Sequence, residues 1–102
     1  MFRHGIQIDE EKLRALCRRN HVEKLSFFGS FTRDDFGPDS DIDVLVEFIP
    51  GARVGLFELC AMEEQLSELC GGRTVQISTP RSLSKYFRSR VLEEAQLEYV
   101  RA

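Results

Sequence analysis

Two aspartates at the start of an apolar segment have the spacing of a metal-binding pair. Asp41 precedes, and Asp43 lies within, the β-branched and aromatic run IDVLVEF at residues 42–48. In an extended strand, side chains at this spacing share a face, about 7 Å apart along the strand. Such carboxylates raise each other's pKa unless a cation intervenes, and Mg²⁺ is the oxygen-preferring cation that the pair predicts. Taken alone, Asp-x-Asp is more often a solvated acidic loop than a metal site.

A second group of residues upstream has the character of a phosphate cradle. Gly29 and Ser30 follow the apolar segment LSFF at residues 25–28, and SFTR can form one helical turn. Glycine lets a phosphate approach the backbone, while amides at a helix start and the Ser30 hydroxyl can hydrogen-bond its oxygens. Arg33 follows on the same side of the turn and can neutralise phosphate or pair with an adjacent aspartate. A plain strand-ending turn is the alternative interpretation.

The two groups together predict chemistry that neither predicts alone. A phosphate cradle on one strand end and a carboxylate pair on the next are what phosphoryl or nucleotidyl transfer requires. In that chemistry a bound metal ion neutralises phosphate charge and aligns the attacking oxygen.

The elements that must position these groups alternate between helix and strand. The patterns predict a helix at residues 9–20, strands at 25–28 and 42–48, a helix at 56–70, a strand at 73–78 and a mostly helical segment at 79–100. In the last segment, Leu83 and Phe87 are expected on one apolar helix face, with the basic residues on a solvated face. The order predicts a single α/β (α+β) domain over residues 1–102, a small mixed β-sheet with helices packed on it.

Composition excludes some function classes. The net charge of −3 predicts no bulk attraction to nucleic acid or to an anionic membrane. We find no apolar run near 18 residues and no signal-peptide pattern, so the chain is expected to be cytoplasmic and without a membrane segment. Cys17, Cys60 and Cys70 lie in apolar, helical stretches and are expected to be small buried side chains. The isolated His4 and His21 give a zinc site little support.

The combined motif resembles that of a known superfamily. Gly29-Ser30-x-x-Arg33 followed by Ser40-Asp41-x-Asp43 is similar to the signature of nucleotidyltransferases that include DNA polymerase beta and kanamycin nucleotidyltransferase. The greatest similarity is to minimal nucleotidyltransferase domains, and it extends from about residue 22 to about residue 100. The resemblance implies the polymerase beta-like fold, with nucleoside triphosphate, preferably ATP, as substrate and one or two Mg²⁺ ions.

The resemblance also implies roles and a partner. Gly29 and Ser30 would hold the nucleotide phosphates, with Arg33 assigned to the same site, and Asp41 and Asp43 would be the catalytic metal ligands. Many minimal members are antitoxins of HEPN-type toxins, and the chemistry of that pairing is adenylylation of a toxin tyrosine. A HEPN-type toxin is therefore the expected partner. The chain is expected to form either a hetero-oligomer or a homodimer.

One position departs from the family pattern. A third carboxylate is expected on the next core strand, but that segment reads VQISTP at residues 75–80, with Gln76 at the acidic position. An amide oxygen carries no charge and cannot take a proton from the attacking hydroxyl. Residues 69–92 contain no acid that could substitute, and Glu47 lies too far along its strand.

Two functions from different classes remain open. The first is an active, or weakened, Mg²⁺-dependent nucleotidyltransferase of the adenylyltransferase type that modifies a partner protein. The second is a catalytically degenerate antitoxin that neutralises its partner by contact. Gln76 favours the second, whereas the intact Gly29-Ser30 and Asp41/Asp43 favour the first.

Overall fold

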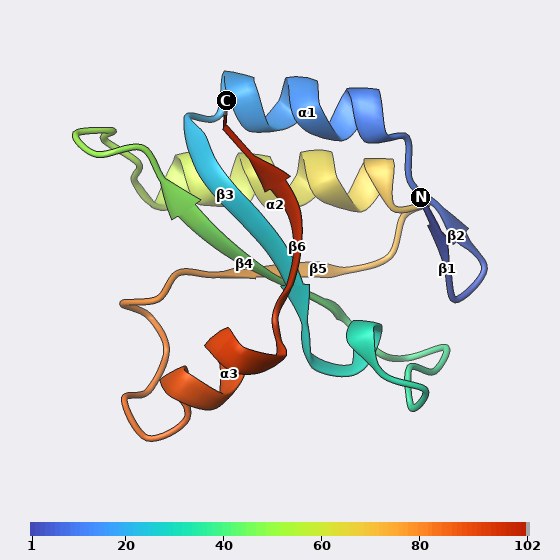
Figure 1. Cartoon of the computed structure of the whole chain (residues 1–102). Helices are drawn as coiled ribbons and strands as arrows, with labels where there is room; N and C mark the ends of the chain where they lie inside the picture. Colours follow the sequence, from blue (N-terminus) through green and yellow to red (C-terminus); the bar gives the residue numbers. More distant parts are fainter. Residues whose placement is uncertain (102) are drawn as a thin grey trace.

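A four-stranded mixed sheet forms the centre of the molecule, and a computed structural model describes it over residues 1–101 (Figure 1). The elements are β1 (Phe2–Arg3), β2 (Ile6–Gln7), α1 (Glu10–Arg19), β3 (Val22–Phe28), the 3-10 turn η1 (Gly29–Thr32), β4 (Ile42–Phe48), α2 (Leu56–Leu69), β5 (Val75–Ser78), α3 (Arg88–Glu94) and β6 (Gln96–Val100). The sheet order is β5-β4-β3-β6, with β3 antiparallel to both neighbours and β4 parallel to β5. The predicted α/β architecture with a small mixed sheet is confirmed.

Acidic side chains accept hydrogen bonds from backbone amides at the start of both long helices. The Asp9 carboxylate accepts hydrogen bonds from the backbone amides of Glu11 and Lys12, at 2.9 and 3.1 Å, and so caps α1. Asn20 ends that helix. Glu58 accepts a 3.0 Å hydrogen bond from the Gly55 amide and closes the first turn of α2. Figure 1 shows α1 and α2 side by side along one face of the sheet, with α3 set apart on the other side.

Strand alternation separates the core from the face that carries the aspartate. On β4, Ile42, Val44 and Val46 are fully buried in the core beneath the long helices. The intervening positions point to the opposite face because strand side chains alternate. Asp43 and Glu47 lie on that second face, and Glu47 is exposed. The parallel β4-α2-β5 crossover then brings distant residues next to β4, with Asp43 and Gln76 as register partners.

The helix covering the parallel strands also contacts the sheet edge. The Glu63 carboxylate on α2 accepts a 2.8 Å hydrogen bond from the backbone amide of Ile77 on β5. Since β5 has a neighbour on one side only, this amide has no strand partner there. A helix side chain therefore completes the hydrogen bonding of the edge strand.

The prediction for the C-terminal segment is wrong in two respects. Only Arg88–Glu94 is helical, and Gln96–Val100 forms strand β6 against the open edge of β3. Tyr99 is buried there opposite Leu25, so burial and ladder hydrogen bonds outweigh helix propensity. Residues 79–87 form turns instead of a helix. The expected Leu83/Phe87 helix face is therefore absent, and Leu83 is buried while Phe87 is 50% exposed.

The cysteine prediction holds for two of the three thiols. Cys17 and Cys70 are buried, and burial raises the pKa of these thiols to about 12 and about 11, respectively. Cys60 is exposed, so its predicted burial is wrong. The helical period explains this: Met62 and Leu66 define the buried face of α2, and a residue two positions before Met62 points away from it. Among residues 1–101, no helix is long and apolar enough to cross a membrane.

Candidate active site

The turn after β3 brings its backbone against the second aspartate. Gly29 has a φ of +69°, in the left-handed region that favours glycine, and Phe28 is the register partner of Asp43. A Cβ atom built on Gly29 would lie 2.5 Å from the Asp43 Oδ2 atom. Glycine is therefore required here for two reasons, its backbone conformation and the close approach of the carboxylate. The structure thus brings Gly29 and Asp43 together, and their roles in phosphate and metal binding stay predictions.

Asp41 and Asp43 form an electrostatically unfavourable pair in the absence of a cation. The pKa of Asp43 is raised, first by burial and second by the negative charge of Asp41. The positive charge of Arg33 acts in the opposite direction and lowers it. A half-buried carboxylate that faces a like charge is the environment in which a hard divalent cation binds. The arrangement therefore fits one Mg²⁺ ion held by these two side chains.

The remaining cradle residues lie in and just after η1. Ser30 is half-buried, and its carbonyl accepts a 3.0 Å hydrogen bond from the Arg33 amide, which tightens the turn. The Arg33 side chain pairs with Asp35 at 3.1 Å, the second of the alternatives raised by the sequence. Arg33 lowers the pKa of Asp35 through this contact. Both side chains of this pair are exposed to solvent, which screens their attraction, so Arg33 can exchange Asp35 for a phosphate.

Gln76 occupies the position where the family pattern has an acid. Its side-chain amide donates a 2.9 Å hydrogen bond to Asp41 Oδ2 and thereby occupies one oxygen of the carboxylate pair. The described residues, 1–101, include no group of three or more histidine, cysteine or acidic side chains able to hold a metal ion. The site thus has two carboxylates and a neutral third position.

One contributor to the site was not predicted. Arg73, directly before β5, donates through Nη2 to the backbone carbonyls of Gly37 and Ser40, at 2.8 and 2.6 Å. Its guanidinium carbon lies 4.5 Å from the centre of the Phe36 ring. Both hydrogen-bond acceptors are backbone oxygens, which leave no pattern in the sequence.

A mixed sheet that places a Gly-Ser turn against an Asp-x-Asp strand defines a nucleotidyltransferase-type site. The family model described as "Nucleotidyltransferase domain" matches residues 10–97, and the chain belongs to this family.

Two relatives that share about a third of their residues with this chain are named as adenylyltransferases. A candidate protein adenylyltransferase of Methanocaldococcus jannaschii is 33% identical over 86 residues, which are 84% of this chain and 89% of that protein. The protein adenylyltransferase MntA of Thermococcus cleftensis is 35% identical over 83 residues, 79% of each chain. The fold is also that of the MNT antitoxin in a solved complex with a tri-AMPylated Shewanella oneidensis HEPN toxin. That likeness has a TM-score of 0.63 at 19% identity and covers 90% of this chain and 70% of that one.

Proposed function

We propose that this chain transfers AMP from Mg-ATP to a hydroxyl group of a HEPN-type partner protein and so acts as its antitoxin. The observation that carries the proposal is the packing of Gly29 against Asp43, with Asp41 beside it. This arrangement joins a backbone surface that a phosphate can approach to a carboxylate pair that lacks a cation. The names of the M. jannaschii and T. cleftensis relatives support adenylyl transfer, and the AMPylated toxin complex supports the partner class. The proposal includes a cytoplasmic location.

The chain's own residues have separable tasks in such a reaction. Gly29 leaves room for the Asp43 carboxylate beside the turn, and the Ser30 hydroxyl and the η1 amides would hydrogen-bond the oxygens of the triphosphate. Arg33 is exposed and can leave Asp35 to neutralise phosphate charge. Asp41 and Asp43 would hold Mg²⁺, which supplies charge neutralisation at the phosphates and alignment for attack. The partner's hydroxyl oxygen would bond to the α-phosphorus as the bond to pyrophosphate breaks.

Gln76 limits what this site can do. It donates to Asp41, whereas a carboxylate at the same position would ligate a second cation and accept the proton of the attacking hydroxyl. We therefore expect nucleotide binding to be affected less than the rate of transfer. The Gln76 contact also favours a second candidate function, in which the chain binds its partner, neutralises it by contact and transfers nothing.

Intact-mass spectrometry of the partner separates the two functions. The chain is co-expressed with the product of the neighbouring gene, and the mass of the purified partner is measured. Added AMP that disappears in Asp41→Asn/Asp43→Asn establishes the enzyme. A stable complex in which wild type and Gln76→Asp both leave the partner mass unchanged establishes the contact antitoxin.

A matched control keeps the charge change but moves it away from the site. Asp34→Asn/Asp39→Asn removes the same two charges from exposed positions of the same acidic stretch. We expect this control to modify the partner as the wild type does. Equal loss in both double variants would show that overall charge, and not the Asp41/Asp43 pair, governs the result.

A further inference from the structure

The loop that carries Asp41 is held by Arg73 and Thr74, the two residues directly before β5. Within the loop, the Ser40 amide donates to the Gly37 carbonyl at 3.1 Å, and the Gly37 amide donates to Ser40 Oγ at 2.9 Å. These two bonds close residues 37–40 into a tight turn. The Ile42 amide then donates to the Thr74 carbonyl at 2.9 Å, so the end of the turn is joined to the strand after α2.

Arg73 is the residue that fastens this turn from outside. One nitrogen, Nη2, donates to both carbonyls that the turn presents, those of Gly37 and Ser40. Ser40 is bonded covalently to Asp41, so the bond to its carbonyl restrains the backbone immediately before the metal-binding side chain. Hydrogen bonds from an ionised donor are about twice as strong as neutral ones. A single guanidinium thus fixes both ends of the turn.

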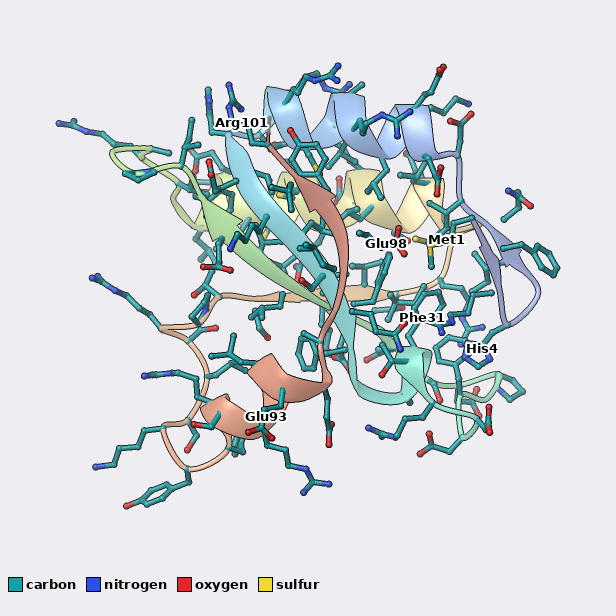
Figure 2. The ribbon with its side chains drawn as sticks, in the orientation of Figure 1. Met1, His4, Phe31, Glu93, Glu98 and Arg101 are labelled. Carbon is teal, nitrogen blue, oxygen red and sulfur yellow. The ribbon has the colours of Figure 1, made fainter. Side chains whose placement is uncertain are left out.

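Aromatic contacts determine where the guanidinium lies. It lies over Phe36 at 4.5 Å, and Phe36 in turn packs against His4 and Phe31, with ring centres 4.7 and 5.2 Å apart. His4 Nε2 is 3.0 Å from the carbonyl oxygen of Phe31 in η1, and Figure 2 shows the two residues together at this end of the molecule. The stack therefore links η1, the acidic loop and the start of β5. It gives Arg73 a defined orientation toward the two carbonyls.

We infer that Arg73 is a positioning residue for the metal site, one that acts through the backbone of the Gly37–Ser40 turn and not through its charge. The inference rests on the proposed function, because it concerns the placement of Asp41 for a Mg-nucleotide. Residues that orient metal ligands typically change metal affinity by about 10–100-fold when they are replaced.

The sign of the effect distinguishes positioning from electrostatics. Removal of a cation that contacts the loop before Asp41 and Asp43 would strengthen binding of a divalent cation if charge alone mattered. Loss of a positioning contact weakens binding, because Asp41 then samples orientations that do not ligate the metal. A weaker affinity in Arg73→Met therefore has no simple electrostatic explanation. Arg73→Lys keeps the charge and a nitrogen that can donate to the carbonyls, but it lacks the planar guanidinium that stacks on Phe36.

The test measures metal binding and loop protection in the same variants. Mn²⁺ affinity in the presence of AMP-PNP is measured by electron paramagnetic resonance, and amide exchange of the peptide over residues 36–42 by mass spectrometry without ligand. Wild type is compared with Arg73→Met, Arg73→Lys and the control Arg14→Met, which changes an exposed arginine on α1. We expect Arg73→Met to bind Mn²⁺ about tenfold more weakly and to exchange faster at 36–42, with Arg73→Lys intermediate and Arg14→Met unchanged.

Each other outcome overturns the inference. Unchanged or tighter Mn²⁺ binding in Arg73→Met would refute the positioning role of Arg73 and leave the proposed function standing. If Arg73→Met does not fold, the Arg73→Lys variant decides. Wild-type affinity and exchange in that variant would show that the guanidinium stacked on Phe36 does not position the turn. A wild type that binds no Mn²⁺ with AMP-PNP refutes the proposed function and this inference with it.

Discussion

The packing of Gly29 against Asp43 gives the sharpest prediction, because one added methyl group tests two separate physical effects. In Gly29→Ala, an L side chain must adopt a φ of +69°, which costs about 1–2 kcal/mol. The new Cβ would also lie 2.5 Å from Asp43 Oδ2, closer than real atoms approach. The nearest atom belongs to the end of a side chain, so we expect the Asp43 carboxylate to move and relieve most of the collision. The loss of stability is then close to the cost of the positive φ alone.

Function is expected to suffer much more than stability. A carboxylate displaced by about 1 Å no longer meets its cation in the required geometry, and such displacements lower rates by about 100-fold. We therefore expect Gly29→Ala to remain folded, with a Tm lower by about 4–8 °C for each kcal/mol lost. Mn²⁺ binding with AMP-PNP and AMP transfer to the partner are expected to fall by about two orders of magnitude.

Gly51 provides the matched control for the stability cost of an alanine at positive φ. It has a φ of +86°, and no atom lies within 4 Å of the position that its Cβ would take. Gly51→Ala should therefore lose similar stability by thermal unfolding while keeping full metal-nucleotide binding. If Gly29→Ala binds Mn²⁺ and AMP-PNP as tightly as Gly51→Ala does, the close approach of Gly29 to Asp43 has no functional role.

Three further variants test other parts of the structure. The pKa of Asp43 is raised in the folded state, so the ionised carboxylate destabilises the metal-free protein above that pKa. Asp43→Asn should therefore raise the Tm at pH 7 but not near pH 3, and thermal unfolding in the presence of a chelator measures both. Gln76→Asp should lower the Tm of the metal-free protein, because the new carboxylate repels Asp41. It should raise the rate of AMP transfer by about 100-fold, the low end of what a general base contributes. An unchanged rate of partner modification would contradict this prediction. Tyr99→Ala should cost about 3 kcal/mol in urea unfolding because it empties a buried site under β6; a loss below 1 kcal/mol would show that β6 adds little to the core.

Local patterns accounted for the elements that depend on local chemistry. The β-branched run at Ile42–Phe48 was predicted with its observed bounds, and the helix predicted at residues 9–20 is observed as Glu10–Arg19. The spacing of Asp41 and Asp43 predicted that their charges interact, and the pKa of Asp43 is raised first by burial and second by the charge of Asp41. Their function as metal ligands stays a prediction.

Features that depend on distant partners could not be predicted in this way. Strand β6 forms because β3 has an open edge, and nothing in residues 96–100 alone identifies that partner. The role of Arg73 depends on two carbonyl groups more than 30 positions away, which any residue type would supply. The position of Gln76 was predicted, but its hydrogen bond to Asp41 depends on the parallel register of β4 and β5.

The contact between Glu63 and the Ile77 amide has a consequence for solubility. An edge strand with free amides is a template on which strands of other molecules can add, and proteins commonly block such edges with charge. Glu63 occupies the amide in the middle of β5 and places a carboxylate along the same edge. An approaching strand would therefore have to displace a charged hydrogen bond before its first backbone pair could form. By this means the side of the sheet that bears Gln76 is protected against self-association as well as being held in register.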